Sequence, residues 1–568
     1  MIRRSLVSIL ALALGLPALA LAQGQVPDAG LAAEGNGQWE EALSVYGGVL
    51  QVEPMRADLW VRVADIQARL GRSDEAAAAL LRATQAAPGD ATLHYRLSQA
   101  YAMTNKPEAA IASADRAMQL APGEPQYLRQ RASLASWVGD YGRAVTLYNR
   151  YLAMQGDDGE AWLALARAQS WRGNATAAIG TLDIYRSRFG DTPAYSLALG
   201  QVLASGGRPS HALDVLDPMY RDNPAGYEVN VARTVALAMQ RSVPAAFDSL
   251  AAVRRLDATR AETRAAERLL RASIGSSVDP GASFYNDSDD LEITRIAPSV
   301  SVMVPASGTQ LSAGYERQIL RAPRANGLGL STGQAAIHEV GWGRVAQGIG
   351  PVTVTGSVGR ASAERFDKTP YSIAARLRAS DAFSVGVEQS DEFLVISPKT
   401  VELGITQIRR RVDLAWSPTM RSYVSVAGSF QDLSDTNERW EITVAPRYGV
   451  VRNEHLNLDL GVYAYRLSVL RDLPNGYYDP SKYENYSGMV FPYFKFSENV
   501  GLGLSIALGG QRQEAEAFRF GAAGSAEATI GIYKAWVLRL GGSAIHNQRM
   551  ESGAFDGYTG SVVLSRRF

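Results

Sequence analysis

Two different spacings of apolar residues divide the chain near Gly275. From residue 23 to about residue 260 the sequence is rich in Ala and Leu, and its apolar positions recur with the period of a helix. Beyond Gly275 the content of Gly, Ser, Thr, Tyr and Val rises, and apolar residues alternate with polar ones. The sequence therefore predicts a two-part fold, with an all-α region over residues 23–274 and an antiparallel β-region over residues 275–568.

The helical half repeats itself every 34 residues. A residue suited to a tight turn recurs at this interval, a small residue follows five positions later, and several prolines share the period. The turn residues are Gly37, Gly71, Asn105, Gly139, Gly173 and Gly207; the small residues are Ala42, Ala76, Ala110, Ala144, Ala178, Ala212 and Ala246; the prolines are Pro54, Pro88, Pro122 and Pro224. Gly156 and Gly190 stand where the fourth and fifth repeats would carry proline.

This period resembles that of the tetratricopeptide (TPR) repeat, a pair of helices that stacks on its neighbours. The Gly or Asn ends helix A, the small residue lets helix B lie close to helix A, and the proline ends helix B. We expect a superhelix of about seven repeats that acts as a binding scaffold. The landmarks that carry the scaffold assignment best are Gly71, Ala76, Pro88, Asn105, Ala110, Pro122, Gly139 and Ala144.

Large aromatic residues also fall on the predicted helices: Trp60, Tyr95, Trp137, Trp162 and Trp171. Two interpretations fit them. They form the core between repeats, or they offer platforms on which a sugar or a partner peptide stacks.

The second half alternates in segments of about ten residues, as in the strands of transmembrane β-barrels. Four stretches show this most clearly, with apolar residues at every other position. They are Val352, Val354 and Val358; Phe383, Val385 and Val387; Leu456, Leu458, Leu460 and Val462; and Leu502, Leu504, Ile506 and Leu508. Because no long apolar stretch follows residue 23, a membrane-embedded chain would have to form a barrel.

Turn residues between these segments give a strand count. Short connections fall near Pro305, Gly348, Asp381, Pro418, Asn453, Glu498 and Tyr533, and longer ones near Asp289, Ala325, Phe366, Val395, Asp435, Gly476, Glu516 and Glu551. Seven short and eight long connections imply about 16 strands, with both ends of the barrel on the side of the short turns. Fourteen strands remain the alternative if the segments near 280–286 and 392–407 are not strands.

The two termini suggest export and assembly. Residues 1–22 have the basic start, apolar centre and small-x-small end of a secretory signal peptide, with Ala20 and Ala22 at the cleavage site. The chain closes on an alternating strand that ends in Phe568, which resembles the signal read by the outer-membrane assembly machinery. Arg566 departs from the apolar residue usual in that strand.

Composition excludes several classes of chemistry. The net charge is zero and there is no cysteine, so neither nucleic-acid binding nor a thiolate site is expected. The five histidines are scattered, and no nucleophile–base motif is present. Asp287-Ser288-Asp289-Asp290 could hold a hard cation, but a solvated acidic loop is the simpler interpretation. We expect no catalytic residues, no metal, no cofactor and no enzyme activity.

A barrel of 16 strands is wide enough for an aqueous channel. If the apolar residues of each strand face lipid, the intervening polar residues face the lumen. The predicted lumen residues are Arg376, Arg378, Glu388, Arg411, Asp413, Arg439, Glu441, Arg447, Asp459, Tyr463, Tyr465 and Arg539. They suit a sliding polysaccharide, which would bind through many weak contacts. They equally suit a lattice of ion pairs that stiffens the wall.

The architecture of TPR repeats followed by a barrel resembles the exopolysaccharide-export porins of the BcsC and PgaA types. The segment from Gly476 through Tyr477, Pro480 and Tyr483 looks like an external loop of the cellulose-export barrels. The resemblance implies an outer-membrane channel for cellulose or another β-linked glycan, in biofilm formation. Its partners would be the polysaccharide chain and, through the TPR region in the periplasm, an inner-membrane synthase complex or a periplasmic modifying enzyme.

An alternative is a surface receptor or envelope-assembly protein with a TPR scaffold, similar to the YaiO and NfrA proteins. That function would go with a plugged barrel and with partners unrelated to glycan synthesis. The long connection from Asp391 to Gln407 is the candidate for a lid or plug in either case.

Overall fold

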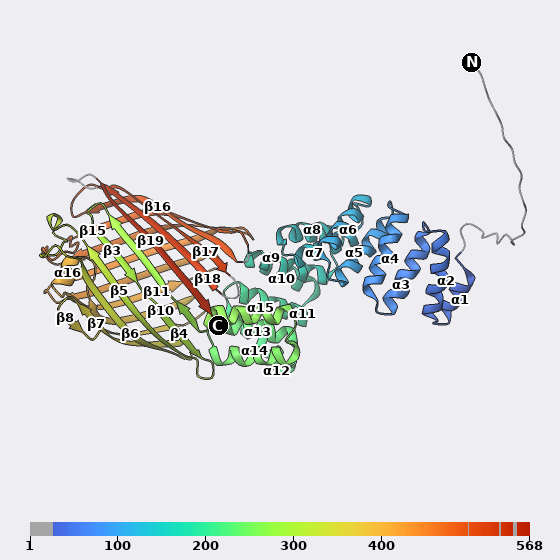
Figure 1. Ribbon diagram of the computed structural model, residues 1–568, viewed down its shortest axis with the longest axis horizontal. Coiled ribbons are helices and arrows are strands. Elements are labelled where there is room, and N and C mark those ends of the chain that lie inside the picture. The colour runs from blue at the N-terminus through green and yellow to red at the C-terminus, as the bar shows by residue number, and fades with distance from the viewer. Residues whose placement is uncertain (1–25, 498, 533–535, 549–553) are drawn as a thin grey trace, which may run out of the picture. The chain divides into compact units, whose positions relative to one another are not determined.

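The computed structural model describes residues 26–497, 499–532, 536–548 and 554–568, which form a helical region followed by a closed β-barrel (Figure 1). The predicted fold class is confirmed. The expected signal peptide lies outside the described residues. The described residues up to Val138 form one compact unit, and those from Gly139 onward form a second, which contains the later helices and the barrel.

Helices of similar length follow one another through the first 274 residues. In the described part they are α1 (Asp28–Gly35), α2 (Trp39–Val52), α3 (Ala57–Arg69), α4 (Ser73–Ala86), α5 (Ala91–Met103), α6 (Pro107–Leu120), α7 (Pro125–Trp137), α8 (Tyr141–Met154), α9 (Gly159–Trp171), α10 (Ala175–Phe189), α11 (Pro193–Ser205), α12 (Pro209–Asp222), α13 (Tyr227–Gln240), α14 (Val243–Asp257) and α15 (Ala261–Ile274). Among the described helices, none combines the length and the apolar character needed to cross a membrane.

The turn residues, small residues and prolines of the 34-residue period lie where the TPR interpretation predicted them. All six turn residues adopt positive φ between helices A and B. Glycine adopts this conformation readily, and asparagine, as at Asn105, does so at a small energetic cost. The small residues from Ala42 to Ala246 are all buried. Pro54, Pro88, Pro122 and Pro224 each follow the end of a helix B by two residues. The turn series continues at Arg241, which has a φ of 64°. Arginine rarely adopts positive φ, so nothing in the sequence indicated this turn.

The barrel strands begin at Ser277. Their segments are β1 (Ser277–Asp279), β2 (Gly281–Asp287), β3 (Glu292–Ile296), β4 (Ser299–Val304), β5 (Thr309–Arg321), β6 (Ala336–Ile349), β7 (Val352–Ala363), β8 (Phe366–Lys368), β9 (Tyr371–Arg378), β10 (Phe383–Phe393), β11 (Thr406–Trp416), β12 (Ser422–Leu433), β13 (Glu438–Arg452), β14 (Leu456–Val469), β15 (Tyr483–Lys495), β16 (Val500–Gln513), β17 (Arg519–Ile532), β18 (Trp536–Gln548) and β19 (Ala554–Arg567).

These nineteen segments make sixteen strands, because three prolines each interrupt a strand without ending it. Pro280 lies between β1 and β2, Pro298 between β3 and β4, and Pro370 between β8 and β9. Proline cannot donate to the sheet, but each of its carbonyls still accepts a neighbouring strand's N–H, at 2.9–3.1 Å. β19 pairs antiparallel with both β1 and β2, which closes the barrel.

Connections at the two ends of the barrel alternate in the predicted order, but the one at Phe366, expected to be long, is a two-residue turn. The short turns after β4, β6, β9, β11 and β13, together with Ser277 and Phe568, lie at one end, here called the short-turn rim. Longer connections, which include residues 322–335, 394–405 and 470–482, lie at the other end, the long-loop rim. Phe366 opens β8 directly after a turn at residues 364–365. Glu498, Tyr533 and Glu551 lie outside the described residues.

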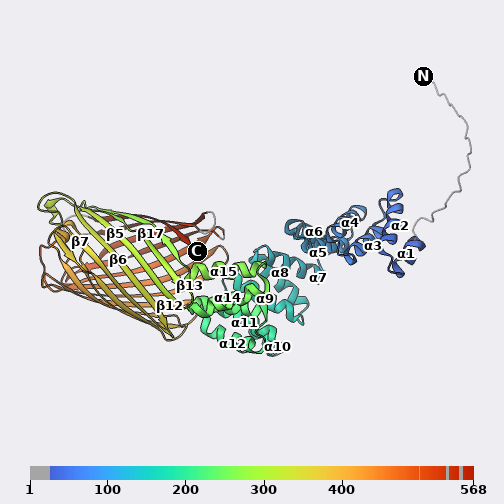
Figure 2. The same ribbon diagram turned by 60° about the horizontal axis from the view of Figure 1, so that its bottom comes forward.

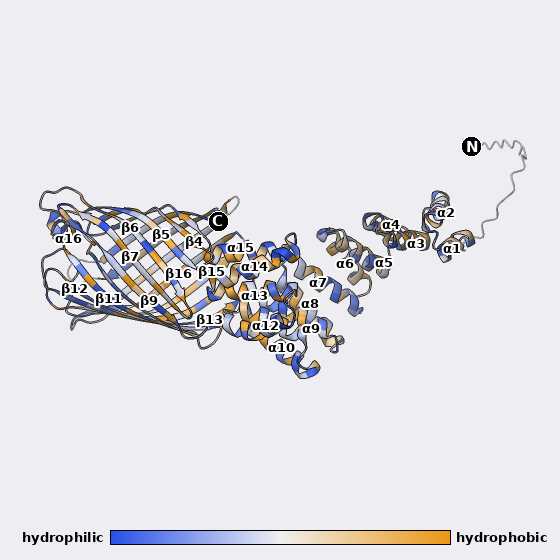
Figure 3. Cartoon of the chain, turned by 90° about the horizontal axis from the view of Figure 1, so that it is seen from below, coloured by the Kyte–Doolittle hydropathy of each residue, from blue (hydrophilic) through white to orange (hydrophobic). Residues whose placement is uncertain are grey.

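Hydrophobic and hydrophilic residues alternate along the strands (Figure 3), and successive side chains of a strand point to opposite faces of the wall. Apolar side chains such as Val358, Val462 and Leu508 are more than half exposed on the outer face. The positions between them are polar or small and face the interior. A closed barrel with an apolar outer face is typical of outer-membrane proteins.

Candidate functional site

All twelve predicted lumen residues occupy inward strand positions. Their sequence neighbours are the exposed apolar ones, for example Leu377, Val387, Val412 and Leu540, so the polar series points to the opposite face. By strand, they are Arg376 and Arg378 on β9, Glu388 on β10, Arg411 and Asp413 on β11, Arg439, Glu441 and Arg447 on β13, Asp459, Tyr463 and Tyr465 on β14, and Arg539 on β18.

Some of these charges stabilise the wall. Arg376 and Asp413 form an ion pair at 2.7 Å, directly over Gly386, where a Cβ would lie 2.6 Å from Asp413. Arg439 and Glu441 are 3.6 Å apart. Ion pairs within the wall therefore account for part of the predicted set. Glu388 on β10 lies directly opposite Arg411 on β11, but among the described residues neither side chain forms an ion pair.

Four tyrosines form a continuous column of rings on the inner face of β14 and β15. The ring centroids of Tyr463 and Tyr465 are 6.2 Å apart, and those of Tyr465 and Tyr483 are 6.1 Å apart. Tyr478, in the long loop that precedes β15, continues the column at 5.9 Å from Tyr483. These four residues are here called the tyrosine column. Tyr478 and Tyr483 were absent from the predicted lumen set, although the inward parity of β15 would have indicated Tyr483.

The tyrosine column carries hydrogen-bonding groups beside its rings. The Tyr465 hydroxyl donates to Glu441 at 2.9 Å, and Ser429 donates to the same carboxylate at 2.9 Å. The next inward position on β15 beyond Tyr483 is Asn485, which lies opposite Tyr465. The column therefore combines flat apolar rings with donors and acceptors on one wall of the lumen.

The connection 394–405 folds into the long-loop end of the lumen. It contains the short helix α16 (Pro398–Glu402), which starts with a capping box of Ser397 and Thr400. Val401 and the preceding Phe393 pack against inward residues of β5, β6 and β7, among them Leu320 and Ala336. This connection is here called the lumen loop.

The other side of the lumen loop packs against the opposite wall. Leu394 and Ile405 form a second buried cluster with Leu433 of β12 and Leu467 of β14, and Tyr465 and Tyr483 pack against that cluster. The lumen loop thus contacts both walls and lies against the long-loop end of the tyrosine column. The lumen loop is the central part of the connection from Asp391 to Gln407, the candidate lid or plug predicted from the sequence.

Polar contacts also hold the lumen loop. The backbone N–H of Lys399 donates to the Leu328 carbonyl at 3.1 Å. The hydroxyl of Ser331 hydrogen-bonds to Glu402 and holds the pKa of that carboxyl below its usual range. Both partners lie in the neighbouring long connection, residues 322–335.

The loop from Gly476 to Tyr483 closes over the same cluster. Tyr477 is buried, and its hydroxyl donates to Asp435 at 2.7 Å. Burial raises the pKa of the Tyr477 hydroxyl. Of the three tyrosines in this segment, Tyr477 anchors the loop, and Tyr478 and Tyr483 belong to the tyrosine column.

At the short-turn rim, helices α8–α14 contact the barrel turns directly. The N–H of Gly142 in α8 donates to Glu454 at 2.8 Å, and Arg421 donates to Asn174, the N-cap of α10, at 3.2 Å. A Cβ on Gly308 would lie 3.2 Å from Pro244 in α14. Helices α14 and α15 lie beside the C-terminus at this rim (Figure 1 and Figure 2). We call this interface the repeat–barrel junction.

The closest part of the repeat–barrel junction joins α12 to the β9–β10 turn. Asp381 is fully buried and accepts the N–H groups of Ser210 and His211, at 2.9 and 3.1 Å, and His211 Nδ1 lies 3.0 Å away. Burial opposes ionisation, but these hydrogen bonds outweigh it and hold the pKa of Asp381 below its usual range. Asp381 thereby caps a helix whose own N-cap, Arg208, makes no side-chain bond to it.

Arg378, predicted for the lumen, serves the same interface. Its guanidinium donates to the carbonyl of Gln240 at the end of α13, at 3.0 Å. A carboxylate at one helix N-terminus and a guanidinium at another helix C-terminus both match the helix dipoles. Sequence reasoning missed this interface, because its partners lie more than a hundred residues apart.

The remaining candidates have structural roles. Asp287 accepts the N–H groups of Asp289 and Leu291, at 2.9 and 3.1 Å, so its carboxylate shapes a turn. Among the described residues there is no cluster of three ligating side chains suited to a metal ion. At the end of β19, the Arg566 guanidinium lies 5.5 Å from the Trp536 ring, and Phe568 pairs with Ser276.

The aromatic residues of the repeats divide between the two interpretations. Trp60 and Trp162 pack against buried clusters, and the indole N–H of each donates to a backbone carbonyl at 2.9 Å. Tyr95 lies 5.1 Å from Tyr127. Trp137 and Trp171 are about half exposed, at 47% and 54%.

Comparison with known proteins identifies the repeats. Family models of the tetratricopeptide repeat match residues 28–91, 70–125 and 138–202. No curated protein sequence matches the chain. Among solved structures, a bacterial polysaccharide outer membrane secretin is 13% identical with a TM-score of 0.44, over 52% of this chain and 99% of the secretin.

Helical repeat proteins are similar to the first half. A tetratricopeptide repeat protein from Parabacteroides merdae is 15% identical with a TM-score of 0.37, over 42% of this chain and 95% of that protein. MamA from Desulfovibrio magneticus is 16% identical with a TM-score of 0.28, over 29% of this chain and 93% of that protein.

Proposed function

We propose that this protein is an outer-membrane export channel for an exopolysaccharide, a cellulose-like or other β-linked glycan. The short-turn rim and the TPR region would face the periplasm, and the long-loop rim would face the outside, as in barrels with short periplasmic turns. The TPR region would then act as the scaffold for a synthase complex or a modifying enzyme. The transport step needs no catalytic group and no cofactor.

The tyrosine column is the observation that carries this proposal. The ring centroids lie about 6 Å apart, with Tyr463 and Tyr465 stacked and Tyr483 edge-to-face with both Tyr465 and Tyr478. Together these rings give a run of apolar ring faces and edges along one wall of the lumen. The faces of pyranose rings are apolar and their rims carry hydroxyls, so a glycan can stack on the rings and bond to Glu441 and Asn485. Several such contacts of similar strength favour sliding over tight binding at one point.

In the described conformation the lumen loop covers part of this surface. Export would require the lumen loop to leave the cluster around Leu433 and Leu467. Glycan and loop would then compete for the faces of Tyr465 and Tyr483. The conformation described here would be the resting state.

Single-channel conductance of the full chain in planar bilayers tests the proposal. Replacing residues 395–404 by a short Gly-Ser linker should raise the conductance, and soluble β-linked oligosaccharides should then block the open channel. Tyr465→Ala with Tyr483→Ala should weaken that block while the conductance persists. An open channel that ignores every glycan would contradict export.

The alternative function, a surface receptor or envelope-assembly factor, is favoured by one observation. The lumen loop packs against both walls, as in a permanently plugged barrel. Under this alternative the linker variant would conduct, but no glycan would block it, and partners captured by the TPR region would be unrelated to glycan synthesis.

A further inference from the structure

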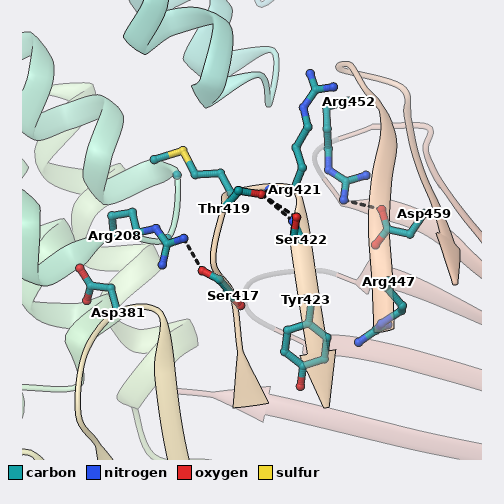
Figure 4. A pocket seen from close by; sticks show the side chains of 13 residues that line it. Arg208, Asp381, Ser417, Thr419, Arg421, Ser422, Tyr423, Arg447, Arg452 and Asp459 are labelled. Carbon is teal, nitrogen blue, oxygen red and sulfur yellow. Dashed lines mark hydrogen bonds and ion pairs between the residues drawn. The ribbon is translucent and has the colours of Figure 1, made fainter. Parts of the chain in front are cut away.

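Four arginines line a cavity at the repeat–barrel junction. Its volume is about 200 Å³, and it lies between the loop before α12, the β11–β12 turn and the inner faces of β12–β14 (Figure 4). Its charged lining consists of Arg208, Arg421, Arg447, Arg452, Asp381 and Asp459.

Both carboxylates of the cavity are already engaged. Asp381 accepts the N-terminal N–H groups of α12 and contacts His211. Asp459 forms an ion pair with Arg452. Asp381 keeps its negative charge, so the cavity lining holds four guanidinium groups against two carboxylates and is net positive.

Of the three guanidiniums other than that of Arg452, two are held by neutral oxygens. Arg208 donates to the carbonyl of Ser417 at 2.5 Å, and Arg421 donates to the side-chain amide of Asn174 at 3.2 Å. Each guanidinium has five N–H donors, so most of their donors stay available. These contacts fix the positions of the two groups without cancelling their charge.

The third guanidinium is held by aromatic rings. Arg447 lies 4.8 Å from the ring centroid of Tyr423 and 5.1 Å from that of Phe491. Stacking uses the face of the guanidinium and leaves its N–H edge for another partner. Within the described residues, no carboxylate lies within ion-pair distance of Arg208, Arg421 or Arg447.

We propose that this cavity binds carboxylate groups carried by the polymer, so that the exported glycan is acidic. The inference rests on the proposed export function and adds the class of polymer. Fixed guanidiniums match the planar, two-oxygen geometry of a carboxylate. The cavity is smaller than usual sites for drug-sized ligands, which suits one charged sugar of a passing chain.

Binding to the full chain in detergent provides the test. Titration calorimetry with short β-linked oligomannuronates should give binding that weakens as salt rises, while neutral β-linked gluco-oligosaccharides of equal length should bind at least tenfold more weakly. Equal affinity for acidic and neutral oligomers would overturn the proposal. Inorganic phosphate that displaces the oligomannuronate more effectively than free mannuronate would also overturn it, in favour of a phosphate site.

Matched variants place the binding in the cavity. Arg447→Gln should lower the affinity for oligomannuronate roughly tenfold, and Arg447→Lys should restore part of it. Arg466→Gln is the control, because Arg466 also stacks on an aromatic ring, at 5.3 Å from Trp440, but on the outer face of the same wall. Unchanged electrophoretic mobility of the unheated protein should show that each barrel has folded. Wild-type affinity in Arg447→Gln would refute the assignment.

This outcome can be separated from that of the export proposal. If acidic and neutral glycans block the channel lacking the lumen loop equally well, export stands and the acidic specificity fails. If no glycan blocks the channel but oligomannuronate binds through Arg447, the cavity stands and export fails.

Discussion

Gly200 illustrates how closely the repeats pack at the scale of single residues. It lies buried in α11, and a Cβ there would be 2.6 Å from the Leu216 side chain of α12. Leu216 is itself fully buried, so it has little room to move. The close approach of the two helices therefore depends on the missing side chain.

Gly200→Ala should destabilise the helical region by about 1–3 kcal/mol, because the added methyl overpacks the core. Gly180→Ala is the control, since Gly180 is exposed in the interior of α10 and a Cβ there meets nothing within 4 Å. The control should be neutral or stabilising by up to about 1 kcal/mol through helix propensity. Thermal melting followed by far-UV circular dichroism measures both. Equal melting of the two variants would contradict the packing account.

Asp381 carries a pH-dependent contribution to the repeat–barrel junction. Asp381→Asn should weaken the capping of α12 by about 1–2 kcal/mol, because it removes charge-assisted hydrogen bonds. Since folding lowers the pKa of Asp381, the wild-type advantage should be complete above the ordinary value of about 4 and vanish as the pH falls through the lower folded pKa.

Hydrogen exchange of the peptide that covers the start of α12 checks this prediction. Asp257→Asn is the matched control, because its carboxyl also has a lowered pKa, from hydrogen bonds with Thr259, but lies at the last residue of α14. Faster exchange at α12 in both variants would mean that the effect is not specific to the repeat–barrel junction.

At the scale of elements, different side chains hydrogen-bond to the equivalent backbone carbonyl in different repeats. Trp60, His94, Trp162 and Asn230 occupy equivalent positions, and each bonds to the carbonyl six residues before it, at 2.9–3.2 Å. This carbonyl follows the end of a helix B and needs a partner. The role explains why a Trp recurs in the repeats without being a binding platform.

Adding one methyl group at Gly404 should displace the lumen loop from its packed position. Gly404 has a φ of +61°, and a Cβ there would lie 2.4 Å from the Phe366 ring. Gly404→Ala should therefore displace the lumen loop and raise the single-channel conductance. Gly350→Ala is the control, because its φ of +56° imposes similar backbone strain in a short turn where a Cβ meets nothing within 4 Å. A rise in the control, or none in Gly404→Ala, would argue against occlusion by this loop.

At the scale of the whole molecule, the helices that contact the barrel belong to the same compact unit as the barrel, from Gly139 onward. A chain that lacks residues 26–138 should still form a heat-modifiable barrel with wild-type conductance. In repeat arrays each repeat depends mainly on its neighbours, so the later repeats should persist. Export of polymer in cells should fall, because the missing repeats would no longer recruit partners.

A longer deletion serves as the contrast. Removing residues 26–226 also removes α12 and the contacts of α8 and α10 with the barrel turns. This chain should form a barrel of lower thermal stability, measured by the temperature at which the compact electrophoretic band disappears. Equal stability of the two truncated chains would show that the repeat–barrel junction does not support the barrel.

The sequence by itself determined the features that depend on local periodicity. The 34-residue interval predicted the repeats, and alternation with turn spacing predicted sixteen strands and the inward position of residues such as Tyr463 and Arg447. Both patterns act within a few residues of the chain, where turn preference and burial choose the conformation. The position of the lumen loop was a hypothesis of the same kind, based on its length.

Only the tertiary structure decided which side chains meet. Asp381 caps α12 from 171 residues away, Arg378 bonds to α13 instead of lining a path, and Tyr478 and Tyr483 extend the column of Tyr463 and Tyr465. No periodic signal encodes such pairs. They arise because closing the barrel and stacking the repeats bring distant residues together, and the free energy of each contact depends on that closure.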